Sequence, residues 1–389
     1  MLRKIMVSEL ALGMHIHEFC RPWDDDPFWI AQIESQLNDT QVLQRIRHSG
    51  LRELWIDISR GKAPDAPPAG DTAPTSLEKE LQRARQICGR ARQLVMAMFD
   101  EAKMGRAMNV EDIGLLVDEI ASSIMRHPHA LISLSRLKNS DEYTYMHSVA
   151  VCALMVALAR RMGLDEEQVR DAGVAGLMHD VGKMMMNPEI LNKPGRLTDD
   201  EFQAMKSHPE AGLKILQETC RVTRAVLDVC LHHHEKFDGS GYPHGLAGDE
   251  ISIFARMGAV CDVYDAVTSD RPYKKAWCAA RAIREMAGWK GHFDDQVFQH
   301  FVKTVGIYPI GALVRLESER LAVVMEQSEH SLLTPRVKVI MSARTRRPLE
   351  HRTLHLGKAQ DTDSIVRIES PEQWGIENYN ELWAGACAV

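Results

Sequence analysis

Apolar residues recur with helical spacing through the middle of the chain, from about residue 108 to about residue 305. Two segments there carry the residues of a capping box, in which a side chain at each end of the first turn bonds the backbone at the other end. These segments are Asp165–Gln168 and Thr198–Glu201. The pattern predicts a bundle of successive helices.

Both ends of the chain have short β-type patterns instead. Residues 1–60 combine alternating apolar positions with a helical stretch near 32–48 and the short apolar run 54–58, which predicts a small α/β module. After residue 309 the apolar runs are brief and separated by charged or Ser-rich turns. These runs are 313–316, 321–325, 337–341 and 365–368. We expect a β-rich appendage over residues 311–389.

Residues 61–75 form a linker, because Pro, Gly, Ala and Asp dominate there and no periodicity survives. The linker would separate the module from a helical domain at 76–310. The predicted fold class is therefore mainly α, with a helical bundle, a small N-terminal α/β module and a short β-rich C-terminal appendage.

An apolar stripe opens the helical domain, with spacings that alternate between four and three residues. Its members are Leu77, Leu81, Ala84, Cys88, Ala91, Val95 and Met98. The stripe fits a signalling coiled coil that forms a homodimer through residues 77–98, and it fits equally well an ordinary helix packed on its own domain. The module and this helix would regulate or dimerise the rest of the chain.

Composition narrows the class of protein. The 389 residues are 45% hydrophobic and 26% charged, as in an ordinary globular protein of two or three domains. A net charge of −7 argues against binding a long nucleic acid. The longest apolar stretch, 149–159, is about half of what a membrane span needs, and the start is too polar for a secretory signal. The 8 cysteines form no CxxC pair and are expected to be reduced. We therefore expect a cytoplasmic protein with no membrane partner.

The 17 histidines matter because several of them lie, with aspartates, on separate predicted helices. The candidates are His147, His179, Asp180, His208, His233, His234 and Asp262. They are spread over about 115 residues and can converge only in a bundle core. Imidazole and carboxylate together suit iron, manganese, nickel, zinc or cobalt, whereas magnesium and calcium favour oxygen ligands. The set exceeds what one ion needs, which predicts two ions that share Asp180 as a bridge.

Each histidine taken singly has an ordinary alternative. His147 or His208 alone would more often be a packed or capping residue than a ligand. The small residues between 172 and 176 favour a metal site, because they let a neighbouring helix approach His179 and Asp180, which follow them. Gly182 and Lys183 come next and place a cation beside the predicted ions.

Three motifs follow one another in order: HDVGK at 179–183, HHEKFDGSGYP at 233–243 and DVYDAVTSDRPYK at 262–274. Together they closely resemble the HD-GYP family of bacterial cyclic di-GMP phosphodiesterases, a subset of the HD metal-dependent phosphohydrolases. The likeness covers about 140 to 310 and implies an HD-type helical bundle. The module before the linker resembles, more weakly, a small N-terminal domain of uncharacterised role that some of these proteins carry.

The resemblance implies that the same seven histidines and aspartates are metal ligands. It places Lys183 beside the scissile phosphate and makes Arg271 and Lys274 phosphate-binding residues, for which the alternative is a solvated loop. Gly241 and Pro243 would shape a rigid loop, with Tyr242 available to line the substrate groove or to pack beneath it.

Some family members hold a third metal with a glutamate four residues before the first histidine. Tyr143 occupies that position here, and Glu142 is one residue out of register, about 100° around a helix. The sequence thus predicts two metals. With the register anchored on Glu235, His232 is a neighbour of the site, and Glu235 is expected to orient a ligand from outside the metal shell.

The activity that the resemblance implies is hydrolysis of cyclic di-GMP to linear pGpG, with or without a second cleavage to GMP. A water between two ions would attack the phosphodiester; iron or manganese is expected, with nickel, cobalt or zinc as alternatives. One rival is a binding module that senses cyclic di-GMP, or docks a diguanylate cyclase through the GYP surface. Another is a hydrolase of a different cyclic dinucleotide, such as cyclic GMP-AMP. The intact set of ligands favours an enzyme over a sensor.

Overall fold

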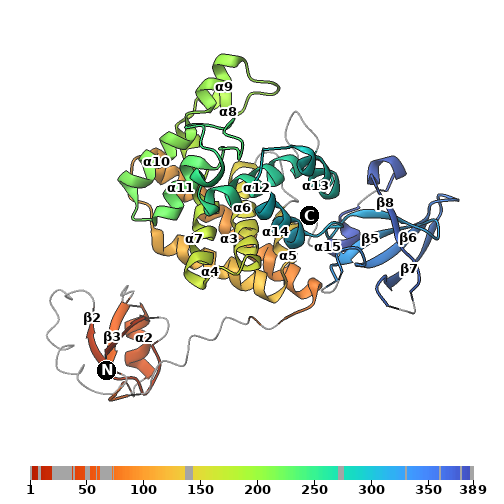
Figure 1. Cartoon of the computed structure of the whole chain (residues 1–389). Helices are drawn as coiled ribbons and strands as arrows, with labels where there is room; N and C mark the ends of the chain where they lie inside the picture. Colours follow the sequence, from red (N-terminus) through yellow and green to blue (C-terminus); the bar gives the residue numbers. More distant parts are fainter. Residues whose placement is uncertain are drawn as a thin grey trace. The chain divides into compact units, whose positions relative to one another are not determined.

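The computed structural model describes residues 2–7, 10–19, 37, 40–48, 53–57, 59–61, 72, 74–135, 143–269, 276–328, 331–358, 361–376 and 379–385. The chain divides into two compact units, residues 1–72 and 73–389 (Figure 1).

The first unit is a small antiparallel sheet with a helix. Its strands β1 (Leu2–Met6), β2 (Ile16–Phe19) and β3 (Glu53–Asp57) pair in the order β1-β3-β2, and the helix is α2 (Thr40–His48). In β3 the side chains of Leu54 and Ile56 are buried while Trp55 between them is exposed, as the alternating pattern predicts. The expected helix near 32–48 is described from Thr40 onward; residues 32–36 lie outside the described part, as does most of the predicted linker.

The second unit is mainly helical, as predicted. Its helices are α3 (Leu77–Lys103), α4 (Val110–Arg126), α5 (Ala130–Ser135), α6 (Tyr143–Arg161), α7 (Glu166–Met178), α8 (Pro188–Leu191), α9 (Asp199–Met205), α10 (His208–Thr219), α11 (Arg224–His232), α12 (Ile253–Thr268), α13 (Ala279–Gly288) and α14 (Asp295–Val305), with the 3₁₀ turns η3 (Val181–Met185) and η4 (Gly248–Glu250). Both predicted capping boxes are present, at the starts of α7 and α9. Among the described helices, none is long and apolar enough to cross a membrane.

Helix α6 runs through the core and is buried on all sides from Val149 to Ala159, which explains its uninterrupted apolar run. Helix α7 packs on it at close range. A Cβ added at Gly176 would lie 2.9 Å from the backbone of Cys152, and one at Gly173 would lie 2.9 Å from Val156. The small residues therefore permit the close helix contact that the sequence indicated, and α7 delivers His179 to the centre of the bundle.

The apolar stripe of α3 packs inside its own unit. All of its residues from Leu77 to Met98 are buried in the main core, together with residues of α4, α5 and α6. The structure thus decides between the two alternatives: this stripe is an ordinary packing face, and its apolar seam is not available for a coiled coil with a second chain.

The C-terminal sheet contains β4 (Leu313–Leu316), β5 (Arg320–Glu326), β6 (Arg336–Ser342), β7 (Pro348–His355) and β8 (Ile365–Glu369), all antiparallel in the order β7-β6-β5-β4-β8. The short elements η5 (Pro371–Trp374) and α15 (Glu381–Ala384) follow it. The four predicted strands are confirmed. Strand β7 was not predicted, because residues 348–353 are all exposed and carry no apolar alternation.

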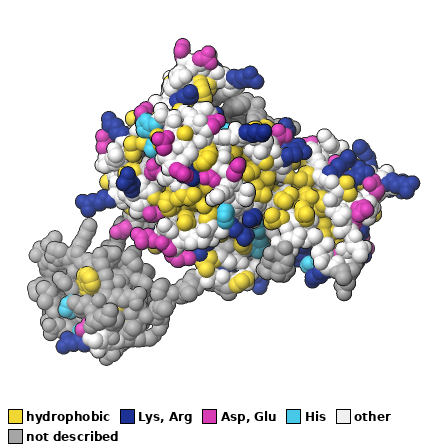
Figure 2. Space-filling view, in the orientation of Figure 1, with side chains coloured by type: hydrophobic (Ala, Val, Ile, Leu, Met, Phe, Trp, Pro, Cys, Tyr) yellow, Lys and Arg dark blue, Asp and Glu magenta, His cyan; other side chains and the backbone are white. Residues whose placement is uncertain are grey.

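One face of the sheet encloses its own apolar core, and residues on the other face, such as Leu321 and Val323, join the core of the helices. Figure 2 shows Lys and Arg side chains gathered over the end of the sheet, where Arg344, Arg346 and Arg347 are exposed. The net negative charge of the chain thus conceals a local basic surface. The six cysteines in the described part are free thiols, as expected.

Candidate metal centre

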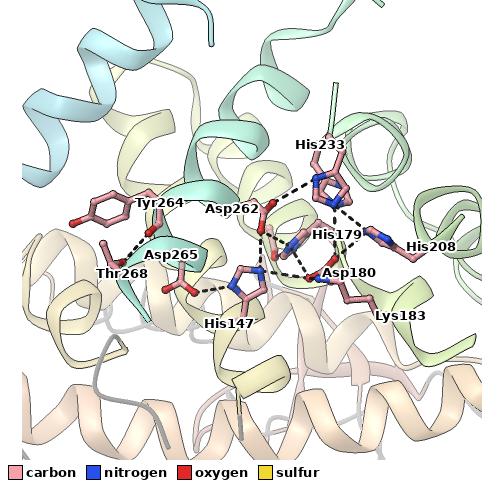
Figure 3. Close-up of polar contacts among 12 residues, drawn as sticks. His147, His179, Asp180, Lys183, His208, His233, Asp262, Tyr264, Asp265 and Thr268 are labelled. Carbon is pink, nitrogen blue, oxygen red and sulfur yellow. Dashed lines mark hydrogen bonds and ion pairs between the residues drawn. The ribbon is translucent and has the colours of Figure 1, made fainter. Parts of the chain in front are cut away.

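The seven predicted ligands come together from five helices and one turn. Figure 3 labels six of them, all except His234. His147 lies on α6 and Asp262 on α12, while the others lie where helices begin or end. His179 caps the C-terminus of α7, Asp180 precedes η3, His208 opens α10, and His233 caps α11 with His234 next to it. All are buried except His234, which is half-buried.

Asp180 lies at the centre and faces two pairs of histidines. Its Oδ2 is 3.4 Å from His147 Nε2 and 3.3 Å from His179 Nε2. Its Oδ1 is 3.3 Å from His208 Nε2 and 3.7 Å from His233 Nε2. Two donors bound to one ion at about 2.1 Å and at right angles are about 3 Å apart. Each oxygen of Asp180 is therefore spaced to share an ion with a different pair.

Asp262 also reaches both sides of the cluster. Its Oδ1 is 3.0 Å from His147 Nε2, and its Oδ2 is 3.7 Å from His234 Nδ1. Two groups of potential ligand atoms result, each within 4.8 Å: His147, His179 and Asp262 in one, and Asp180, His208, His233 and His234 in the other.

Backbone carbonyls fix how the imidazoles present their nitrogens. His179 Nδ1 donates to Gly176 O at 2.8 Å, and His208 Nδ1 donates to Met205 O at 2.7 Å. His233 Nδ1 likewise contacts carbonyls at the end of α11. Because a carbonyl only accepts, each Nδ1 carries the hydrogen, and each neutral ring presents the lone pair of Nε2 to the centre.

Several atoms at the centre lack the partner that burial demands. His208 Nε2 and His233 Nε2 face each other at 3.4 Å, so that two lone pairs meet unless a cation lies between them. Within the described part of the chain, His179 Nε2 and Asp180 Oδ1 have no hydrogen-bonding partner. Buried polar atoms are almost always satisfied. Nitrogen and carboxylate donors arranged in this way fit transition-metal ions.

The charges of the cluster support one another. Burial acts to raise the pKa of Asp180, but the positive charges of His179 and Lys183 outweigh this effect. The pKa of Asp180 is therefore well below its ordinary range. Burial likewise acts to lower the pKa of His179, but Asp180 and Asp262 raise it to about 10. For His233 burial prevails and the pKa falls to about 4. Without a metal, the carboxylates thus hold protons on some of the imidazoles, and a metal would displace those protons.

Lys183 lies beside this centre, with its Nζ 2.5 Å from Asp180 Oδ2. The turn that carries it requires the preceding glycine: a Cβ at Gly182 would lie 1.9 Å from the carbonyl oxygen of His208. The turn η3, which follows Asp180, and the start of α10 are therefore in direct backbone contact. This contact brings Asp180 and His208 together.

The loop after α11 contains Gly241, Tyr242 and Pro243 and is called the GYP loop; it lies against His234. The ring of Tyr242 stacks on that imidazole, with the ring centroids 4.7 Å apart, and the Tyr242–Pro243 peptide is cis. Gly241 is needed because a Cβ there would lie 2.3 Å from the backbone nitrogen of Lys236. The ring of Tyr242 thus contacts a candidate ligand, and its predicted place at the substrate groove stays a prediction.

The contacts of Glu235 in the described structure are with the GYP loop. Its buried carboxylate accepts hydrogen bonds from the backbone N–H groups of His244 at 2.7 Å and Gly245 at 3.1 Å. These contacts fasten the GYP loop to the end of α11. In the described part of the chain no hydrogen bond joins Glu235 to an imidazole, and the orienting role stays a prediction. His232 turns away from the cluster, to Asp228 at 2.8 Å and His244 at 3.1 Å.

Asp265 is a residue that the sequence reasoning missed. Its Oδ2 lies 2.6 Å from His147 Nδ1, so this buried carboxylate orients the ring of a candidate ligand. The available signal was its position one helical turn after Asp262, on the same face of α12.

Four other predictions fall where the structure gives no description. Arg271 and Lys274 lie in residues 270–275, outside the described residues, and Glu142 lies in 136–142. The helix assignment includes Tyr143, but its side chain is not described. The predicted phosphate contacts and the predicted absence of a third metal therefore stay predictions.

Known proteins match both parts of the chain. A family model described as an HD domain matches residues 121–297, and one described as a domain of unknown function matches residues 2–113. A cyclic di-GMP phosphodiesterase of Pseudomonas aeruginosa is 54% identical over 99% of this chain and 96% of its own. A cyclic di-GMP phosphodiesterase response regulator of Xanthomonas campestris is 39% identical over 42% of this chain and 44% of its own. A 3'3'-cGAMP-specific phosphodiesterase of Vibrio cholerae is 34% identical over 49% of this chain and 37% of its own.

The Pseudomonas relative matches essentially end to end, and the HD domain model covers the segments that supply the histidine–aspartate cluster. The GYP loop lies against that cluster in the structure. The chain therefore belongs to the HD-GYP family of bacterial cyclic di-GMP phosphodiesterases, within the HD metal-dependent phosphohydrolases.

Proposed function

We propose that the chain hydrolyses cyclic di-GMP with two transition-metal ions, of which iron or manganese is favoured, held by the two groups of ligands around Asp180. The observation that carries this proposal is the position of Asp180, whose two oxygens face separate pairs of histidines. A bridging carboxylate with imidazoles on each side is suited to a two-metal site. Nickel, cobalt and zinc accept the same donors and remain alternatives.

Bound metal ions would supply Lewis acidity and a hydroxide source near neutral pH. The protein's own part is to fix the donors and to hold a cation beside them. Lys183, with its ammonium 2.5 Å from Asp180, is placed to neutralise negative charge that develops on phosphate oxygens in the transition state. Asp265 and the carbonyls behind the imidazoles keep the rings aligned. No covalent intermediate on the enzyme is needed.

The substrate assignment draws on the relatives. The Pseudomonas protein, at 54% identity over the whole chain, is named a cyclic di-GMP phosphodiesterase, and we propose linear pGpG as the first product here. A second candidate, hydrolysis of a different cyclic dinucleotide such as cyclic GMP-AMP, is favoured by the Vibrio relative named for that substrate.

We also propose that the first unit regulates the catalytic part of the chain. A second copy of the chain and a diguanylate cyclase are the proposed partner proteins. A homodimer would have to use a surface other than the buried stripe of α3. The GYP surface is the proposed docking site for a diguanylate cyclase.

The decisive experiment is anaerobic purification with metal analysis, followed by identification of the products from cyclic di-GMP. The natural sequence should contain about two ions per chain and release linear pGpG, and Asp180→Ala should lose both. Asp171→Ala is the matched control, because it changes an aspartate of α7 that lies outside the cluster. A protein that binds cyclic di-GMP tightly but releases no linear product over hours would instead be a sensor.

A further inference from the structure

Helix α9 carries an aromatic side chain outward beside the candidate centre. Phe202 on α9 is 46% exposed, and α8 and α9 project from the helical body (Figure 1). The helix is anchored by its capping box and by Lys193, whose ammonium lies 2.6 Å from Glu201. A single exposed apolar residue is ordinary on a protein surface. What sets Phe202 apart is the set of groups that follows it toward the metal cluster.

Lys206 joins Phe202 to the GYP loop. It caps the end of α9, two residues before His208, and its Nζ lies 4.8 Å from the ring centroid of Phe202 and 5.4 Å from that of Tyr242. The ring of Tyr242 in turn stacks on His234 of the cluster. An exposed ring, an ammonium group and a second ring thus form one continuous row that ends at the candidate metal centre.

The chemistry of this row matches one part of the proposed substrate. Aromatic side chains bind nucleic-acid bases by stacking, because every base has a π-face. A lysine ammonium can donate to O6 and N7 of guanine, whereas adenine presents an N6 amino donor next to its N7. The row therefore offers both a surface for a base and a group that distinguishes guanine from adenine.

We propose that Phe202 and Lys206 form a guanine-binding subsite, in which Phe202 stacks on one base of the cyclic dinucleotide and Lys206 donates to its O6 and N7. This inference rests on the proposed function and extends it to the choice of base. While the base is absent, the ammonium lies against the two rings, and a cation–π contact of this kind can be exchanged for contacts with a ligand.

The test compares three substrates: cyclic di-GMP, cyclic di-AMP and bis(p-nitrophenyl) phosphate, which has no base. Phe202→Leu should raise KM for cyclic di-GMP about tenfold, with kcat changed less than about twofold, because leucine cannot stack on a base as an aromatic ring does. Phe202→Tyr keeps an aromatic ring and should have the same KM for cyclic di-GMP as the natural sequence. Lys206→Met keeps the aliphatic stem and should raise KM for cyclic di-GMP about tenfold while it changes that for cyclic di-AMP little. Turnover of the base-free diester should stay constant throughout.

Lys214→Met on α10 is the matched control, since it removes the same charge from an exposed position. If Phe202→Leu and Lys206→Met behave like this control on all three substrates, the subsite is wrong and the proposed function stands. A wild-type protein that cleaves bis(p-nitrophenyl) phosphate but neither cyclic dinucleotide would overturn the proposed substrate and the subsite together.

Discussion

The helices of the second unit and its C-terminal sheet both bury apolar cores, but the helical core also encloses a cluster of aspartates and histidines. The sheet's own core contains only Val, Leu and Ala side chains. The helical core buries Asp180 and Asp262 among imidazoles. Burying an ion costs several kcal/mol, which its partners repay only with good geometry. Burial of apolar surface thus accounts for the sheet, whereas the helical cluster needs the metal ions that we propose for it.

The largest effect should follow from removing one imidazole on either side of Asp180. His147→Gln and His208→Gln should each lower kcat by at least about 10³-fold, or roughly 4 kcal/mol, because a two-metal reaction needs both ions. Metal analysis and turnover of cyclic di-GMP would measure this. Full activity with one group disrupted would mean that the two groups do not act as one centre.

The sheet should show the opposite behaviour, with lost stability and unchanged chemistry. Leu354→Ala deletes a buried side chain of β7 and should lower the free energy of unfolding by about 2–5 kcal/mol. Activity per folded molecule should not change. Urea denaturation and turnover would be measured alongside Leu349→Ala, an exposed leucine of the same strand, which should stay within about 0.5 kcal/mol. A loss of bound metal in Leu354→Ala would show that sheet and cluster are coupled.

A smaller effect on metal affinity is expected from Asp265, which contacts the candidate ligand His147. Asp265→Asn keeps the shape of the side chain but removes the charge that faces His147 Nδ1. Metal affinity should fall about 10–100-fold, which is typical for partners of metal-bound imidazoles. Competition with a chelator would measure the affinity, and an unchanged value would remove Asp265 from the proposed centre.

The smallest effect concerns a carboxylate that needs no metal. Asp294 caps α14, accepting from Gln296 N at 2.8 Å and Val297 N at 3.1 Å. Burial acts to raise its pKa, but these bonds and Arg256 lower it below the ordinary 3.8. Its contribution to stability is therefore present above pH 3.8 and lost as the pH falls through the lower pKa of the folded state.

Asp294→Asn keeps a capping side chain but loses the negative charge at the N-terminus of α14, and it should accordingly lower the free energy of unfolding by about 0.3–1 kcal/mol at pH 7 and by less in acid. Urea midpoints of both proteins at pH 7 and pH 3 would test this. The same difference at both pH values would mean that the charge of Asp294 does not contribute.

Elements with an apolar pattern were predictable from the sequence. The runs 313–316 and 365–368 became strands with boundaries shifted by one residue at most, because short apolar runs between charged or Ser-rich turns favour strands. Strand β7 contains no apolar run of this kind. Its residues 348–353 are exposed, and it is a strand because β6 offers it hydrogen bonds. Strand pairing of this kind depends on tertiary contacts that no local pattern contains.

The ligand set was predictable because few residue types bind transition metals and the motifs supply them in order. The supporting contacts were less accessible. Sequence adjacency suggested that Glu235 serves an imidazole, but the chain folds back and brings the amides of His244 and Gly245 to its carboxylate. Phe202 and Lys206 belong to no quoted motif, and only the fold places Lys206 between the rings of Phe202 and Tyr242.

The backbone contact between Gly182 and His208 also bears on which ions the chain accepts. Since no side chain separates the two segments, the backbones that carry Asp180 and His208 are held at close range, and only the side chains remain free to adjust to an ion. Any side chain at position 182 would push the two backbones apart, and with them the aspartate and the histidine that each one carries.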